Sequence, residues 1–171
     1  VEADCLYSGI MIDTNNFLTK TGVRTFEAAA YLRRSGADVT SVRKLFRDSM
    51  NDYKLRAEVV RNAELFLSNY AISITPEEIL IESPTIIGAQ AANELLNING
   101  VKASFVLTTF QNQVYISARS IDEVNVQIIM EKLGGGGHLN IAGAQLTGVD
   151  AKEAKRLLMN TIEKMTREGD I

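Results

Sequence analysis

The residues best suited to chemistry are four consecutive glycines followed by the only histidine of the chain: Gly134, Gly135, Gly136, Gly137 and His138. Ordering such a run is costly, because glycine loses more backbone entropy on folding than any other residue. The run stands between an apolar helical stretch and a β-prone stretch, which favours an ordered turn over a linker between domains. Backbone N–H groups of such a turn can bind an anion, and an imidazole can donate to a phosphate. A tight connection beside an incidental histidine is the alternative, and the residues alone leave both open.

A second candidate is Arg119, which ends a β-rich run and offers a planar fork that matches phosphate oxygens and stacks on bases. A surface arginine on an edge strand is the alternative. Ser117 on the same run is a further candidate, and Asn125 could cap the next helix or bond a ligand. The glycine run lacks the lysine and hydroxyl residue of a P-loop and precedes a strand, so it matches neither a P-loop nor a dinucleotide fingerprint.

The candidate metal ligand is Asp13, which ends an apolar run. Open α/β sheets place ligand sites at the carboxyl ends of buried strands, and a carboxylate there suits Mg²⁺ or Mn²⁺. An ordinary turn aspartate is the alternative. A hydrolytic site with two metal ions about 3.5–4 Å apart needs several ligands, and no cluster of aspartates and histidines accompanies Asp13. Arg24, on a turn further along, could meet a phosphate near a metal or be solvated.

Composition narrows the class of protein. The chain of 171 residues is 46% apolar and carries a net charge of −3, which argues against binding of long nucleic acid. One cysteine, Cys5, excludes a disulfide framework and a cysteine-based zinc site. The sequence shows no secretory leader and no apolar run that could cross a bilayer, so we expect a cytoplasmic protein. Because the chain begins at Val1 and enters an apolar run at once, we expect a fragment of a longer protein.

The pattern of elements predicts an α/β (α+β) fold. Residues 6–12 could be a helix or a strand, since periodicity cannot decide over so few residues. A long amphipathic helix is predicted over 51–69, and its many charges suit a connector between two lobes. After it, strand, helix, hairpin, helix, strand and helix alternate, which implies a mixed sheet with helices packed on it. The predicted strands are 70–75, 102–109, 113–120 and 141–146, and the predicted helices of this lobe are 84–96, 122–133 and 151–167.

Two groups of segments resemble a known family. The first resembles the last motif of the DHH phosphoesterase domain: GIMIDT (9–14), TGVRTF (21–26) and AAAYL (28–32). The second resembles the DHH-associated substrate-binding domain: ISARS (116–120), NV (125–126), GGGGH (134–138) and AGA (142–144). Nearly the whole chain is covered, and the subfamily that it resembles most is the membrane-anchored GGDEF-containing cyclic-di-AMP phosphodiesterases. The implied domains are a phosphoesterase remnant over 1–50, a helical linker over 51–69 and a substrate-binding domain over 70–171.

The resemblance implies a manganese-dependent phosphodiesterase that opens cyclic di-AMP to the linear dinucleotide. By the same resemblance, Asp13 is a metal ligand, while Arg119 and residues 134–138 hold the substrate. The Asp-His-His motif that names the family is absent from this sequence, so we expect this chain alone to lack a complete two-manganese site and to be inactive. We expect a cyclic dinucleotide or short oligonucleotide as ligand, no membrane contact and a membrane-anchored parent. A homodimer is one oligomeric state that stays open.

Three other functions stay open at this point. An oligoribonuclease or adenosine-bisphosphate phosphatase of the same superfamily would use the same residues. A noncatalytic module that binds RNA or a nucleotide would not need the end of a phosphoesterase domain that Asp13 marks. An interaction piece could dimerise through the helix over 51–69.

Overall fold

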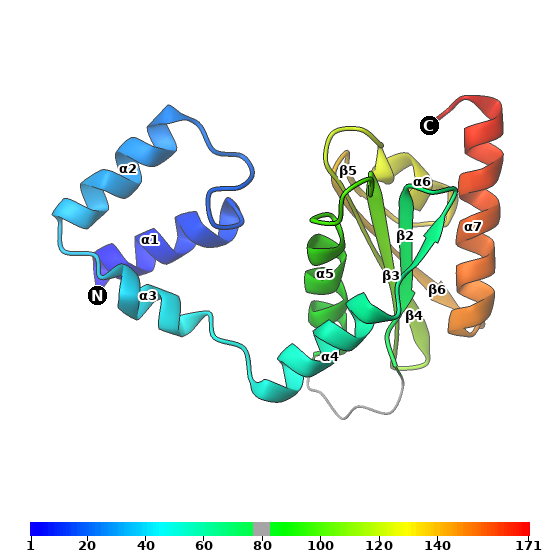
Figure 1. Ribbon diagram of the computed structural model, residues 1–171, viewed down its shortest axis with the longest axis horizontal. Helices are drawn as coiled ribbons and strands as arrows, with labels where there is room; N and C mark the ends of the chain where they lie inside the picture. The colour runs from blue at the N-terminus through cyan, green and yellow to red at the C-terminus, as the bar shows by residue number, and fades with distance from the viewer. Residues whose placement is uncertain (77–82) are drawn as a thin grey trace. The chain divides into compact units, whose positions relative to one another are not determined.

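The computed structural model describes residues 1–76 and 83–171, which form two compact units, Val1–Ser49 and Met50–Ile171 (Figure 1). Seven helices and a six-stranded mixed sheet lie in the described residues, which confirms the α/β class. No helix in these ranges is both long enough and apolar enough to cross a membrane.

Three helices form the first unit: α1 (Glu2–Asp13), α2 (Val23–Arg34) and α3 (Val39–Leu45). Its small core consists of Tyr7, Ala29, Leu32, Ala37 and Val42. The Asp38 carboxylate begins α3 by accepting a hydrogen bond from the Thr40 backbone N–H at 3.0 Å, as an N-cap residue does. Residues 6–12, for which helix and strand were both open, lie within α1 and are helical.

The second unit is built on one sheet with strand order β1-β2-β3-β4-β6-β5, in which only β2 and β3 are parallel. Its strands are β1 (Glu64–Phe66), β2 (Tyr70–Ile74), β3 (Ala103–Phe110), β4 (Gln113–Ser120), β5 (Gly136–His138) and β6 (Ile141–Thr147). Its helices are α4 (Met50–Arg61), α5 (Pro84–Leu95), α6 (Val126–Lys132) and α7 (Ala151–Glu168). A two-residue turn at Gln111 and Asn112, both with positive φ, joins β3 to β4. The predicted hairpin is thus confirmed, and β3 extends one residue beyond its predicted end, to Phe110.

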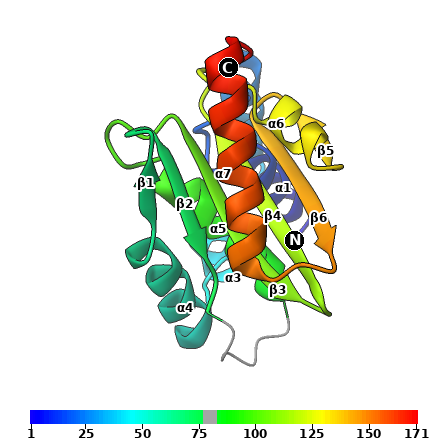
Figure 2. The same ribbon diagram turned by 90° about the vertical axis from the view of Figure 1, so that its right-hand side faces the viewer.

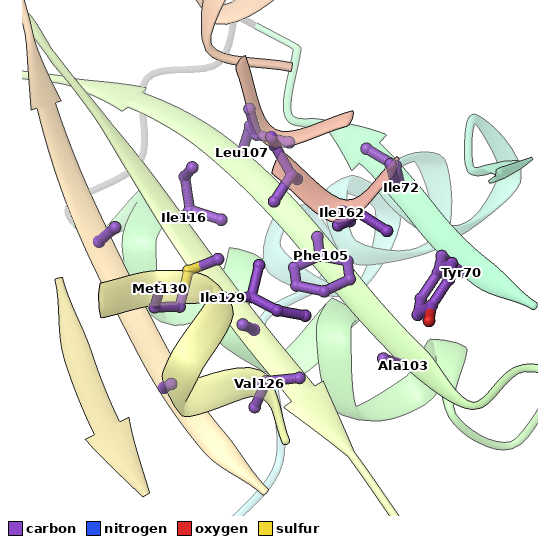
Figure 3. Packing of buried hydrophobic residues seen from close by; sticks show 14 of the residues in the cluster. Tyr70, Ile72, Ala103, Phe105, Leu107, Ile116, Val126, Ile129, Met130 and Ile162 are labelled. Carbon is purple, nitrogen blue, oxygen red and sulfur yellow. The ribbon is translucent and has the colours of Figure 1, made fainter. Parts of the chain in front are cut away.

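Helices cover both faces of this sheet. Figure 1 shows α5 and α7 on opposite sides, and in Figure 2 α7 crosses the near face with α6 beside it. The larger core lies under α6 and α7, where Phe105, Ile116 and Met130 pack together (Figure 3). The smaller core joins α4 and α5 to the other face. Along β4, buried and half-buried residues alternate, so this strand sends every second side chain to the face that carries α5.

The helix predicted over 51–69 is wrong in its carboxyl-terminal part. It ends at Arg61, and Glu64–Phe66 forms β1, which turns back onto β2 through Leu67 and Ser68, both with positive φ. The charged pattern that suggested a solvent-facing connector belongs to a packed helix, because Leu55 and Val59 are buried against α5. Tertiary packing here overrides the local pattern of charges.

Candidate functional site

The register of three strands brings two of the predicted site residues to one face of the sheet. Arg119 of β4 pairs with Ile141 of β6, and Ile141 pairs with His138 of β5. Residues paired across strands share a face, and neighbouring strands lie about 4.8 Å apart, so the Arg119 and His138 Cα atoms are roughly 10 Å apart. This face is the one that carries α5, and among the described strands α5 packs chiefly on β3 and β4 rather than on β6 and β5. The arginine and the histidine therefore line one accessible strip, which we call the Arg119–His138 row.

The row beside it is almost free of side chains. Ser117 pairs with Gly143, and Gly143 pairs with Gly136, so this second row holds one hydroxymethyl group and two glycines on the same face. A Cβ added at Gly136 would meet no atom within 4 Å among the described residues. The backbone of β6 and β5 is thus open to close approach by a flat or bulky ligand, and we call this strip the glycine floor.

Arg119 is held in place by two hydrogen bonds. Its Nε donates to Asn93 Oδ1 of α5 at 3.1 Å, and its Nη1 donates to the Ala118 carbonyl at 2.9 Å. The side chain is half-buried, and this burial lowers the pKa of the Arg119 guanidinium from its ordinary value. The guanidinium nevertheless stays charged at neutral pH, because an arginine pKa lies far above 7. It presents a fixed positive charge toward the accessible face.

The structural reason for a glycine differs among the four positions of the run. Gly134, with φ of 78°, ends α6: its N–H donates to the Glu131 carbonyl at 3.1 Å, and the Gly135 N–H donates to the Met130 carbonyl at 2.8 Å. These two bonds form a Schellman motif, which favours glycine at the left-handed position. A Cβ on Gly135 would lie 2.6 Å from the Ala144 Cα, and one on Gly137 would lie 2.5 Å from the Ala142 Cα. Backbone conformation at Gly134 and close packing at Gly135 and Gly137 thus explain three of the glycines, and Gly136, on the glycine floor, is left without a structural reason.

The run 134–138 is ordered, as the sequence favoured, but most of it is the edge strand β5 rather than an open turn. The turn that follows is fixed on the α6 side, where the Val126 N–H donates to the Leu139 carbonyl at 3.0 Å and the Ser120 N–H donates to the Asn140 carbonyl at 3.1 Å. His138 itself is exposed. A rigid backbone therefore presents an imidazole that a ligand can reach.

A pocket of about 370 Å³ adjoins the glycine floor. Its side chains come from Thr85 at the start of α5, from Tyr115 and Ser117 of β4 and from Gln145 of β6, and its backbone wall includes Gly134 and Gly143. Tyr115 and Gln145 are cross-strand partners. No charged side chain is among the described residues that line it.

Three of the sequence candidates lie elsewhere. The Asn125 side chain caps α6 by accepting from the Gln127 backbone N–H at 3.1 Å, so it has the capping role of the two that the sequence left open. Asp13 ends a helix, not a buried strand, and is exposed, as is Arg24 in α2. Both belong to the first unit. Nowhere in residues 1–76 and 83–171 do three or more His, Cys, Asp or Glu side chains gather, so these residues do not fit a two-metal centre.

Sequence reasoning missed Asn93, Tyr115 and Gln145. The alternation of β4 offered a signal for Tyr115, since residues two and four positions before Arg119 must share its face. Nothing local links Asn93 to Arg119, because their contact depends on how α5 packs on the sheet.

A family model described as the DHHA1 domain matches residues 82–168. Two curated relatives are similar to nearly the whole chain. Cyclic-di-AMP phosphodiesterase PdeA of Listeria monocytogenes is 44% identical over 164 residues, which are 95% of this chain and 25% of that protein. Cyclic-di-AMP phosphodiesterase GdpP of Bacillus subtilis is 43% identical over 170 residues, 99% of this chain and 26% of that protein. The chain thus spans about a quarter of the length of these relatives.

Among solved structures, an exopolyphosphatase-related protein from Bacteroides fragilis superposes with a TM-score of 0.83 at 25% identity. The match covers 95% of this chain and 50% of that one, so both units have counterparts there.

Proposed function

Because the chain belongs to the DHHA1 family, we propose that it is the carboxyl-terminal part of a manganese-dependent phosphodiesterase that hydrolyses cyclic di-AMP to the linear dinucleotide. In this proposal the second unit binds the dinucleotide. The names of the relatives PdeA and GdpP support the substrate. We also propose that this chain is the cytoplasmic part of a membrane-anchored parent.

The observation that carries the binding role is the placement of Arg119 and His138 on one accessible face beside the glycine floor. A cyclic dinucleotide carries two phosphodiester groups, and cationic or donor groups at both ends of one row suit such a ligand. The Arg119 fork keeps N–H groups at Nη2 for phosphate oxygens, since within the described residues only Nε and Nη1 are engaged. The exposed imidazole of His138 donates a second hydrogen bond.

The glycine floor explains how such a ligand can come close. Side chains at Gly136 or Gly143 would stand between the phosphates and the strand backbone, so their absence lets a sugar–phosphate ring lie on the sheet. This is the role that we assign to Gly136, for which packing gives no reason.

The chemical step belongs to residues that this site does not contain. The described residues do not form a metal centre, so the part we assign to this chain is to bind and orient the substrate. By resemblance, Asp13 would contribute one oxygen ligand to manganese in the whole protein. We therefore expect the 171-residue chain to bind the dinucleotide without metal and not to hydrolyse it.

The test is a calorimetric titration of the 171-residue chain with cyclic di-AMP and with its linear product, with and without Mn²⁺, repeated on His138→Ala. Losing one charge-assisted hydrogen bond costs about 1.5–3 kcal/mol, so we expect the variant to bind roughly 10- to 100-fold more weakly without metal. Undiminished binding by the variant, or no binding under any condition, would contradict the proposed role of the row. Mn²⁺-dependent hydrolysis of cyclic di-AMP by the 171-residue chain would contradict the proposal that this chain binds the substrate without hydrolysing it.

A further inference from the structure

We propose that the pocket beside the glycine floor is a subsite for one adenine base of the substrate, in which Gln145 reads the edge of the base and Tyr115 packs against the ring. This inference rests on the proposed function, because it places a base where the phosphates at the Arg119–His138 row would direct it.

The register sets the distance between the two sites. Arg119, Ser117 and Tyr115 are successive residues on one face of β4, and such residues are about 6.7 Å apart along a strand. The Tyr115–Gln145 pair therefore lies roughly 13 Å from Arg119, with the glycine floor between them. A nucleotide whose phosphate meets Arg119 can lay its sugar across the floor and reach the pocket with its base.

The chemistry of the pocket differs from that of the row. The Arg119–His138 row offers a charge and an imidazole, whereas the side chains of the pocket that the structure describes are uncharged. Gln145 is exposed, and its carboxamide makes no hydrogen bond within the described parts of the chain. A glutamine carboxamide can accept from the adenine N6 amine and donate to N7, a pairing that guanine cannot match because it presents two acceptors there.

Tyr115 supplies a surface for stacking. Its ring is half-buried and is held against Phe110, with 6.3 Å between the ring centroids and 54° between the ring planes. Aromatic side chains held in this way are the usual platforms for unpaired bases. A ring that contacts Phe110 and also lines the pocket suits a single base.

The size of the pocket limits what it can hold. Its volume of about 370 Å³ is at the lower end of the range of roughly 300–1,000 Å³ for small-molecule sites. One nucleoside fits such a volume better than a whole cyclic dinucleotide. We therefore assign the pocket to one of the two bases.

The test compares the affinities of the 171-residue chain for cyclic di-AMP and cyclic di-GMP. The variants are Gln145→Ala and Gln145→Glu, which removes the donor but keeps the side-chain length. Gln113→Ala is the matched control, because Gln113 lies on the same face of β4 but outside the pocket. Base discrimination by one bidentate pair is worth about 1–3 kcal/mol, so we expect both Gln145 variants to lower the preference for cyclic di-AMP by about 5-fold or more.

Gln113→Ala should leave this preference within about 2-fold, and Arg119→Ala should weaken binding of both ligands alike. If the wild-type chain binds cyclic di-AMP through Arg119 but Gln145→Ala keeps the full preference, the subsite is wrong and the proposed function stands. If the wild-type chain binds neither ligand, both are wrong.

Discussion

Two alanine substitutions, at Gly137 and at Gly136, distinguish a glycine that packing requires from one that we assign to ligand binding. At Gly137 an added Cβ would lie 2.5 Å from the Ala142 Cα and 2.8 Å from the Ala142 Cβ, and the φ of 149° is rarely adopted by residues with a side chain. Overpacking costs about 1–3 kcal/mol and such a backbone conformation about 1–3 kcal/mol more. The lower entropy of alanine in the unfolded chain returns about 0.4–1 kcal/mol. The net expectation for Gly137→Ala is a loss of roughly 2–5 kcal/mol in the free energy of unfolding.

At Gly136 the same methyl group meets open space, so we expect Gly136→Ala to change the free energy of unfolding by no more than about 0.5 kcal/mol. The methyl group would project onto the glycine floor and weaken binding of cyclic di-AMP. Thermal unfolding followed by circular dichroism measures the first effect, and calorimetric titration measures the second. We expect Gly137→Ala to lower the Tm by on the order of 10 °C and Gly136→Ala to leave it nearly unchanged.

If the two variants unfolded at the same temperature, the close approach of β5 to β6 would impose no need for glycine at 137, contrary to the distances given above. Wild-type affinity in a fully folded Gly136→Ala variant would refute the assignment of Gly136 to the ligand.

Three further predictions follow from single contacts. Asn93→Ala removes the acceptor of the Arg119 Nε hydrogen bond, so the guanidinium is less well oriented and cyclic di-AMP should bind roughly 2- to 10-fold more weakly in titrations. Because Asn93 is exposed, the Tm of the variant should fall by no more than a few degrees. Gly88→Ala would press against Thr108 Oγ1, which lies 2.9 Å from Thr75 Oγ1 in the core, and should cost about 1–3 kcal/mol in chemical denaturation. The hydrogen bond from Lys155 lowers the pKa of the exposed Glu64, so its stabilisation, at most about 1 kcal/mol, is present at neutral pH and is lost as the pH falls through that lowered pKa. Glu64→Gln should thus lower the Tm slightly at neutral pH and not in acid, and a difference that grows in acid would contradict this sign.

Much of the second unit could be predicted because its local signals agree with its packing. Proline at the first position of α5, Asp150 before α7 and the β-rich runs around Gln111 and Asn112 all mark elements where the structure has them. These signals depend on capping and turn conformation, which act over a few residues. The end of α4 and the existence of β1 could not be predicted, because a three-residue strand is specified by its pairing with β2 rather than by its own sequence.

The candidate site, too, could be predicted only in part from local signals in the sequence. Glycine, histidine and arginine stood out by residue type, and β-strand alternation could place Ser117 and Tyr115 beside Arg119. The pairing of Arg119 with Ile141 and of Ile141 with His138 depends on β6 lying between β4 and β5, a strand order that no local pattern states. Gln145 entered the site only through that strand order, and Asn93 only through the packing of α5 on the sheet.

The binding of cyclic di-AMP at the Arg119–His138 row is tested most directly by a double-mutant cycle. The affinity for cyclic di-AMP, without divalent metal, is measured for the wild-type chain, Arg119→Ala, His138→Ala and the double variant. We expect each single variant to bind about 10-fold or more weakly than wild type and the double variant to bind more weakly still. All four chains should have the same Tm within a few degrees. Wild-type affinity in the double variant would show that the dinucleotide does not bind at the Arg119–His138 row.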